Sequence, residues 1–173
     1  ADVILFMVDA KEGLVASDYE VANMLRKTKK PVILTVNKVD RIGATPPEVY
    51  EFYNLGMGDP VPISSLHGLG IGDLLDLIYD HFPEDTEDDY DETAIKVAVI
   101  GKPNVGKSSL INRILGEDRL IVTNIPGTTR DAVDSFVEKN GDKFIFIDTA
   151  GIRRKSKITD NIEKYSELGH GRQ

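Results

Sequence analysis

Four continuous runs of β-branched and aliphatic residues stand out along the chain. They cover residues 3–8, 32–36, 97–100 and 144–147. None alternates apolar with polar positions, which is the pattern of strands buried on both faces of a parallel sheet. Weaker strands are predicted over 61–64 and over 133–138, which alternates and suits an edge strand. The second of these is expected to pair with 143–148 in a hairpin turning at Asn140-Gly141.

Segments with helical spacing of apolar residues lie between these runs. Ser17 is expected to cap the first helix, and Thr45 with the two following prolines opens the second, which Gly56 ends. Apolar stripes predict further helices around 74–81 and 110–115, and a weaker one over 161–168. Six strands and five helices in alternation predict a doubly wound α/β fold with ligands at the carboxyl ends of the strands.

Composition narrows the class of protein. A chain of 173 residues with 40% apolar and 29% charged residues fits one compact domain and excludes collagen-like and low-complexity proteins. The absence of cysteine excludes a disulfide scaffold, thiol catalysis and a cysteine zinc site, and fits a reducing, cytoplasmic setting. Since no apolar run approaches the roughly 20 residues of a membrane helix, no membrane partner is expected.

The net charge of −8 is concentrated in one stretch of the chain. Seven of the nine residues from 84 to 92 are acidic and account for all but about −1 of that charge. We interpret 83–94 as a solvated acidic linker between one half at 1–82 and another at 95–173. A metal-binding carboxylate cluster is the alternative, but the run lacks the glycine-shaped turns and fixed spacing of such a site.

A glycine-rich segment, GKPNVGKS at residues 101–108, matches the phosphate-loop pattern GxxxxGK[ST] and lies between a predicted strand and a predicted helix. Its glycines allow the backbone to wrap phosphates, so that N–H groups and the helix dipole face the anion. Lys107 is expected to reach the β/γ oxygens and Ser108 to ligate Mg²⁺. The alternative is a glycine-rich turn with a solvated lysine. The residues expected to contact the nucleotide here are Asn104, Val105, Gly106, Lys107, Ser108 and Ser109.

The sequence Asp148-Thr149-Ala150-Gly151 follows the buried run at 144–147. This position places the Asp148 carboxylate at the carboxyl edge of the sheet, where it suits a water-mediated Mg²⁺ contact. The Gly151 N–H is placed to meet a γ-phosphate. The DxxG pattern is weak alone and becomes strong after a phosphate loop.

The sequence Asn37-Lys38-Val39-Asp40 follows the run at 32–36 and bears on the identity of the base. Guanine offers N1–H and an exocyclic amine that one carboxylate accepts together, whereas adenine offers no such pair, so Asp40 is expected to select guanine. Asn37 would tie this loop to the phosphate loop, and the stem of Lys38 would cover the base. A polar β–α turn is the alternative.

Three further residues, Ser64, Ser65 and Leu66, follow the next predicted strand. They are placed to present backbone N–H groups to guanine O6. The signal is weak by itself, and its value comes from its position after the next strand end.

Together these motifs resemble the translation-factor-like GTPases, but with the base-recognition motifs ahead of the phosphate loop. Natively permuted GTPases of the YlqF type have this order. The EngA family, also called Der, would present it in a segment running from the end of its first G domain into its second. Residues 52–64 and 67–70 resemble the former, and 126–131, 148–157 and 163–166 resemble the latter. The resemblance covers about residues 1–168 and lapses over 169–173.

The resemblance to EngA implies a three-layer P-loop NTPase G domain with a mostly parallel six-stranded sheet in circularly permuted order. It implies binding of GTP and GDP, hydrolysis of GTP, and a role in assembly of the large ribosomal subunit. Mg²⁺ ligation would come from Ser108 and Thr129, with Asp148 reaching the ion through water. K⁺ would lie beside the phosphates, near Asn104 and the loop containing Thr123, Ile125 and Thr128.

Catalysis is expected to be slow without a partner, because Ile152 stands where other GTPases place a water-orienting glutamine. A cation beside the phosphates would neutralise charge that develops between the β- and γ-phosphates. The residues expected to act in catalysis are Lys107, Thr129, Gly151 and Asn104. A nucleotide-binding fragment with little or no turnover, and a fragment that serves only in interaction, are the alternatives.

We predict that the two halves assemble within one chain, since roughly 12 linker residues span at most ~40 Å. The chain is then expected to be a monomer, and a dimer formed by swapping halves is the alternative. Because the protein is acidic, RNA contact is expected to be weak at most. The basic segment 153–157 is the candidate for this contact, and a solvated loop is the alternative.

Overall fold

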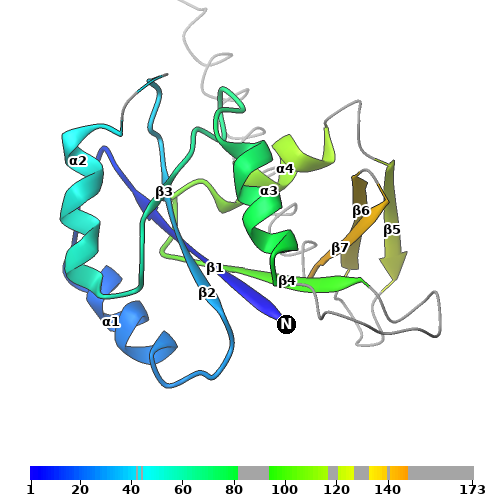
Figure 1. Ribbon diagram of the computed structural model, residues 1–173, viewed down its shortest axis with the longest axis horizontal. Helices are drawn as coiled ribbons and strands as arrows, with labels where there is room; N and C mark the ends of the chain where they lie inside the picture. Colours follow the sequence, from blue (N-terminus) through cyan, green and yellow to red (C-terminus); the bar gives the residue numbers. More distant parts are fainter. Residues whose placement is uncertain are drawn as a thin grey trace, which may run out of the picture.

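The structure is a computed structural model that describes residues 1–41, 43, 45–81, 94–116, 121–126, 133–139 and 141–147. The helices and strands follow one another in alternation over most of this length (Figure 1). In chain order they are β1 (Val3–Asp9), α1 (Ala16–Leu25), β2 (Val32–Asn37), α2 (Pro47–Tyr50), the 3₁₀ helix η1 (Glu51–Leu55), β3 (Val61–Pro62), α3 (Ile71–Tyr79), β4 (Ile95–Ile100), α4 (Lys107–Leu115), β5 (Ile121–Pro126), β6 (Val133–Lys139) and β7 (Asp142–Phe146).

All strands belong to one sheet with the order β3-β2-β1-β4-β7-β6-β5. The first five strands in that order run parallel to their neighbours, and β6 and β5 complete the sheet in antiparallel pairs. In the centre, β1 pairs with β4 in a register that runs from Val3 opposite Val97 to Phe6 opposite Ile100. Strands from 1–82 and from 95–173 are therefore hydrogen-bonded side by side, and the predicted mostly parallel α/β fold is confirmed.

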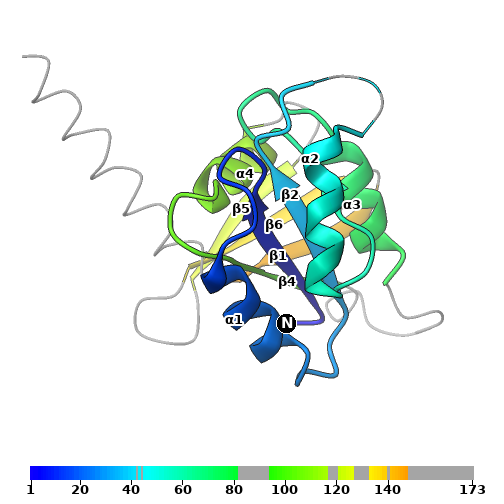
Figure 2. The ribbon, with the colours of Figure 1, turned by 90° about the vertical axis from the view of Figure 1, so that its left-hand side faces the viewer.

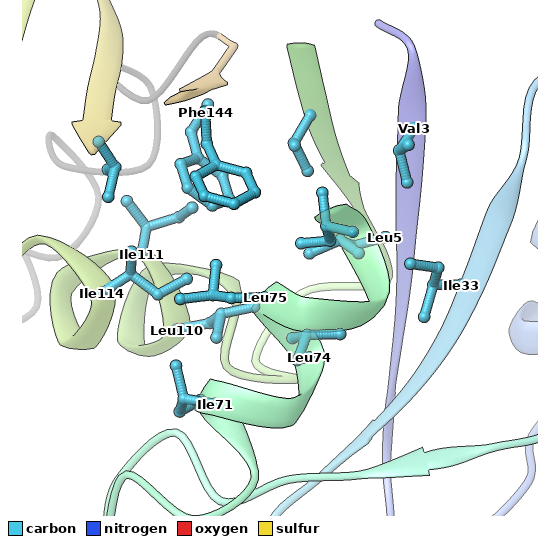
Figure 3. Close-up of a cluster of buried hydrophobic side chains, with 14 of the residues drawn as sticks. Val3, Leu5, Ile33, Ile71, Leu74, Leu75, Leu110, Ile111, Ile114 and Phe144 are labelled. Atoms are coloured by element: carbon cyan, nitrogen blue, oxygen red, sulfur yellow. The ribbon is translucent and has the colours of Figure 1, made fainter. Parts of the chain in front are cut away.

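Helices cover both faces of the sheet, and β1 is buried on both sides. Every second residue of β1 from Val3 packs toward α3 and α4, while the residues between, such as Phe6, pack toward α1, α2 and η1. Figure 2 shows α1 and α2 in front of β1 and β2. In the core on the opposite face, side chains of α3 and α4 such as Leu75 and Ile111 point toward the sheet (Figure 3). The absence of alternation in the sequence of β1 follows from this double burial.

The helix ends differ in part from what the sequence predicts. Ser17 does not cap α1, because the helix begins at Ala16 and Ser17 lies within its first turn. Asp18 instead accepts a hydrogen bond from the N–H of Val15 through its Oδ2 atom, at 3.2 Å. The prediction that Gly56 ends the second helical segment is confirmed, since this residue caps η1 at a φ of 62°.

The six predicted strands are all present, and β5 is an additional one. The β6–β7 hairpin is confirmed, with Lys139 opposite Asp142 and with Gly141 at a φ of 92°. The prediction that 133–138 forms the edge of the sheet is wrong, because β5 pairs along β6 from Ile121 opposite Glu138 to Pro126 opposite Val133. The predicted helix over 161–168 and the acidic linker lie outside the described residues. Among the helices that the structure describes, none has the length and apolar character to span a bilayer.

Two leucines of α3 allow the packing of this helix to be tested. The Leu74 side chain is fully buried, whereas that of Leu77 is 37% exposed. We expect Leu74→Ala to lower the free energy of unfolding by about 2 to 5 kcal/mol, because it leaves a cavity in the core. Leu77→Ala removes the same atoms and should cost less than about 1 kcal/mol. Urea unfolding measures both, and equal losses would contradict this packing.

Candidate functional site

The polar residues singled out in the sequence follow the carboxyl ends of neighbouring parallel strands. Strand β1 ends at Asp9, β2 at Asn37 and β4 at Ile100, and these three strands are adjacent in the sheet. Because parallel strands end at the same edge, the segments that follow them meet there. This edge is the candidate site.

The predicted phosphate loop connects β4 to α4, and its close packing explains two of its glycines. A Cβ atom on Gly101 would lie 2.4 Å from the carbonyl oxygen of Met7, and one on Gly106 would lie 2.1 Å from Nδ2 of Asn37. Gly106 also has a φ of 104°, and Asn104 a φ of 63°. The loop therefore needs glycine for space and for backbone conformation, and the predicted strand–loop–helix context is confirmed.

Helix α4 begins at Lys107, so the backbone N–H groups of Lys107, Ser108 and Ser109 belong to its first turn. The Lys107 ammonium donates hydrogen bonds to the carbonyl oxygens of Gly101 and Lys102, each at 2.6 Å. The lysine thus folds back over its own loop. The Val105 side chain anchors the loop to the core, because it is fully buried there.

Asn37 joins the base-recognition residues to the phosphate loop. Its side-chain Nδ2 donates a hydrogen bond to the carbonyl oxygen of Val105 at 2.7 Å, and its Oδ1 accepts two from Ser65, from the backbone N–H and from Oγ, each at 2.9 Å. The side chain is buried and all of these contacts are inside the protein. The predicted link between Asn37 and the phosphate loop is therefore present.

Asp40 lies beside Asn37 and already has partners. Its Oδ1 accepts a hydrogen bond from Oγ of Ser64 at 2.8 Å, and its Oδ2 forms an ion pair with Lys11. Lys11 and Ser64 hold the pKa of the Asp40 carboxyl below its ordinary value of 3.8, so this group is ionised at neutral pH. An ionised carboxylate is acceptor-only, as recognition of two donors on a base requires.

The other predicted base contacts occupy the same edge. Lys38 has a φ of 68°, and its ammonium pairs with Asp9. Ser64 is buried and closes the loop that follows β3 through hydrogen bonds with Leu69. Leu66 is 75% exposed at the tip of that loop.

Most of the other residues predicted to contact Mg²⁺, K⁺ or the γ-phosphate come late in the chain. Thr128, Thr129, Asp148 and Gly151 lie outside the described residues, and Thr123 and Ile125 lie on β5. Within the described residues, no group of three or more His, Cys, Asp or Glu is arranged to hold a metal ion.

Four charged residues next to the site were not singled out in the sequence. Asp9 is the last residue of β1, Lys11 and Glu12 follow that strand, and Lys102 lies within the phosphate loop. The one sequence feature that could have identified them is their position, because charged residues directly after a buried strand lie at the edge of the sheet where ligands bind.

Comparison with known protein families agrees with the motifs at this edge. Residues 1–84 match the family described as "Elongation factor Tu GTP binding domain", and 96–171 match "50S ribosome-binding GTPase". The chain is 70% identical over 168 residues to "GTPase Der" of Ruminiclostridium cellulolyticum, an alignment that covers 97% of this chain and 38% of that protein. The resemblance to the Der family is confirmed.

Other relatives in the Der family give the same result. The protein of that name from Acetivibrio thermocellus is 70% identical over 166 residues, and that of Clostridium perfringens is 61% identical over 168. These alignments cover 96% and 97% of this chain. In each case the chain spans 38% of the length of the relative.

The close approach of Gly106 to Asn37 is testable by substitution. Gly106→Ala should displace the Asn37 amide and lower the free energy of unfolding by about 2 to 3 kcal/mol, through backbone strain and a broken hydrogen bond. Gly58→Ala is the matched control, because its φ is 88° and no described atom lies within 4 Å of the added carbon. It should cost only the strain, about 1 kcal/mol. Urea unfolding and the Asn37 side-chain amide resonances report both effects, and equal behaviour of the two variants would refute the contact.

The charge of Asp9 predicts a pH-dependent contribution to stability. Burial alone would raise the pKa of Asp9, but the ion pair with Lys38 and two backbone N–H groups outweigh it and lower the pKa below 3.8. Since the folded pKa lies below the unfolded one, this stabilisation is present above about pH 4 and is lost as the pH falls through the folded pKa.

Asp9→Asn should therefore lower the free energy of unfolding by about 1 to 2 kcal/mol at pH 7. The difference from the unsubstituted chain should shrink as the pH falls below about 4. Urea unfolding over a pH series measures it, with Asp73→Asn at an exposed position of α3 as the control. A difference that stays constant down to acid pH would contradict the lowered pKa.

Proposed function

We propose that this chain binds guanine nucleotides and hydrolyses GTP to GDP and phosphate, as the name of its Der relatives states for those proteins. The observation that carries the proposal is the buried Asn37 side chain, which contacts Val105 of the phosphate loop and Ser65 at the same time. A base held by the loop after β2 and phosphates held by the loop before α4 then belong to one ligand. The two halves, 1–82 and 95–173, would work as a single G domain.

The phosphate loop supplies binding and charge stabilisation in this proposal. Backbone N–H groups from Asn104 to Ser109 would face the phosphates, helped by the dipole of α4. Lys107 would exchange its two carbonyl partners for the β- and γ-phosphate oxygens. Its present contacts with carbonyl oxygens keep the ammonium hydrogen-bonded at the site until the anion arrives.

Guanine selection would rest on Asp40. Its carboxylate would accept hydrogen bonds from N1–H and the exocyclic amine, and Ser64 can remain bound because each carboxylate oxygen has two lone pairs. Lys11 is 64% exposed and would move into solvent. Lys38 would cover the base with its stem, while backbone N–H groups from Ser64 to Leu66 would meet guanine O6.

The described residues fit an Mg²⁺ ion held mainly by the nucleotide. Mg²⁺ commonly takes one or two protein ligands together with phosphate oxygens and water, so a cluster of carboxylates is not required. Ser108, in the first turn of α4, and Thr129 would each supply a hydroxyl ligand, and Asp148 would reach the ion through water. The ion would neutralise charge on the phosphates. K⁺ beside Asn104, near Thr123, Ile125 and Thr128, would add to this neutralisation.

The remaining parts of the proposal concern turnover and partners. Turnover by the chain alone would be slow, because Ile152 cannot orient water, and Lys107, Thr129, Gly151 and Asn104 would carry what catalysis there is. We propose further that the protein acts in the cytoplasm as a monomer on the large ribosomal subunit, in line with the family description matched by 96–171. Direct RNA contact would be weak.

Substitution of Asp40 tests the proposed base recognition. Asp40→Asn should weaken GDP binding by about 10- to 100-fold, because the amide presents a donor where the base also has donors, and should leave ADP binding unchanged. Calorimetry with GDP, GTP and ADP measures this, and phosphate release in KCl follows turnover. Asp73→Asn on the exposed face of α3 is the matched control. Equal affinity of the unsubstituted chain for GDP and ADP would refute the proposed recognition of guanine.

A further inference from the structure

The loop after β1 is built around the buried carboxylate of Asp9. Its Oδ1 atom accepts hydrogen bonds from the backbone N–H of Lys11 at 2.9 Å and of Glu12 at 3.2 Å. The Asp9 side chain is only 5% exposed. Two fixed N–H donors on one carboxylate oxygen define the conformation of residues 9–12, which we call the bridging loop.

One side of the bridging loop holds the base-recognition residues. The Oδ2 atom of Asp9 forms an ion pair with Lys38, and the backbone N–H of Ala10 donates to the carbonyl oxygen of Asn37 at 2.9 Å. These contacts join the bridging loop to the segment that carries Asp40 by charge and by backbone. The base-recognition residues are therefore fixed relative to residues 9–12.

The other side of the bridging loop holds the phosphate loop. Glu12 Oε2 lies 2.9 Å from the ammonium of Lys102, whose side chain is only 11% exposed, and Asp18 Oδ2 lies 3.9 Å from the same nitrogen. Within the described residues this ammonium has no hydrogen bond of good geometry. Since a buried charge is costly unless it is paired, Glu12 and Asp18 are what keep Lys102 in this position.

The position of Lys102 matters because of its backbone. Its carbonyl oxygen is one of the two that accept hydrogen bonds from the Lys107 ammonium, at 2.6 Å. The side chain that contacts Glu12 and the carbonyl that contacts Lys107 therefore belong to one residue of the phosphate loop. The contact between Glu12 and Lys102 thus connects the bridging loop to the part of the site that would hold phosphates.

We infer that the bridging loop is a positioning element that sets the spacing between the base-recognition residues and the phosphate loop, with Glu12 and Lys102 as its positioning residues. This inference rests on the proposed binding of a guanine nucleotide. A ligand that contacts both loops binds more tightly when their spacing is fixed beforehand, because less ordering is required on binding. A ligand that contacts the phosphate loop alone gains nothing from that spacing.

Glu12→Gln tests the inference with little change in shape. It should weaken GDP binding by about two- to fivefold, the range of a partly exposed ion pair, while binding of inorganic pyrophosphate is not weakened. A purely electrostatic effect has the opposite sign, since loss of a negative charge beside the phosphates would tighten both anions. Unchanged or tighter GDP binding, or equal weakening of GDP and pyrophosphate, would overturn the inference.

Variants of Lys102 and an exposed carboxylate provide the controls. In a Lys102→Met background, Glu12→Gln should have no further effect on GDP binding, because its partner is gone. Lys102→Arg keeps the charge and should retain the effect. Glu20→Gln removes the same charge from the exposed face of α1 and should leave GDP binding unchanged. A full effect of Glu12→Gln without Lys102 would also overturn the inference.

Amide hydrogen exchange of the nucleotide-free chain gives a second, independent measurement. Glu12→Gln should speed exchange by about twofold or more both in 101–107 and in 37–40, since both segments lose a fixed neighbour, and Glu20→Gln should change neither. Faster exchange in only one segment, or in neither, would contradict a bridge. If the unsubstituted chain binds no GDP, the proposed function fails, while the exchange result still decides whether residues 9–12 connect the two loops.

Discussion

The pairing of β1 with β4 is the contact on which the rest of the molecule depends. These strands come from segments separated by most of the described chain, and their hydrogen bonds make one sheet of them. Strand β1 supplies alternate residues to the cores on both faces of the sheet, and the core beneath α3 and α4 contains buried residues of both β1 and β4. Parallel pairing also brings the ends of the two strands to the same edge, so the loops that carry the polar residues meet.

At that edge, hydrogen bonds between buried polar groups, more than apolar packing, hold the loops in place. Asn37 is enclosed, and its contacts with Val105 and Ser65 satisfy its amide at both ends. A buried amide with unmatched donors or acceptors would destabilise the fold, so this arrangement tolerates few alternatives. The absence of a side chain at Gly106 belongs to the same arrangement, since any Cβ atom there would occupy the space of the Asn37 amide. The conformation of this edge thus depends on the hydrogen bonds of Asn37 and on its close packing against Gly106.

The sequence predicted the parallel part of the sheet well. Burial on both faces leaves a continuous run of apolar residues in β1 and β2, and β4 has a shorter run at 97–100. The prediction failed at β5, whose residues 121–126 include asparagine and proline and follow no apolar pattern. The prediction of the start of α1 was wrong for a different reason. The Asp18 side chain accepts a hydrogen bond from the Val15 N–H, and helix-capping propensity does not distinguish Asp18 from Ser17. In the site, the motif residues were found from their spacing. Glu12 and Lys102 were not, because an ion pair between residues 90 positions apart has no signature along the chain.

The separation of β1 from β4 also bears on how the chain reaches its fold. About 90 residues are synthesised between Phe6 and its partner Ile100, which at about 5 to 20 residues per second takes on the order of 5 to 20 s. During that interval the edge of β1 that β4 covers in the folded chain lacks this partner, and an unpaired apolar strand edge can pair with other chains. Emergence of β4 from the ribosome ends this exposure. The length of the segment between the two strands therefore sets how long β1 must wait for the partner that it has in the folded chain.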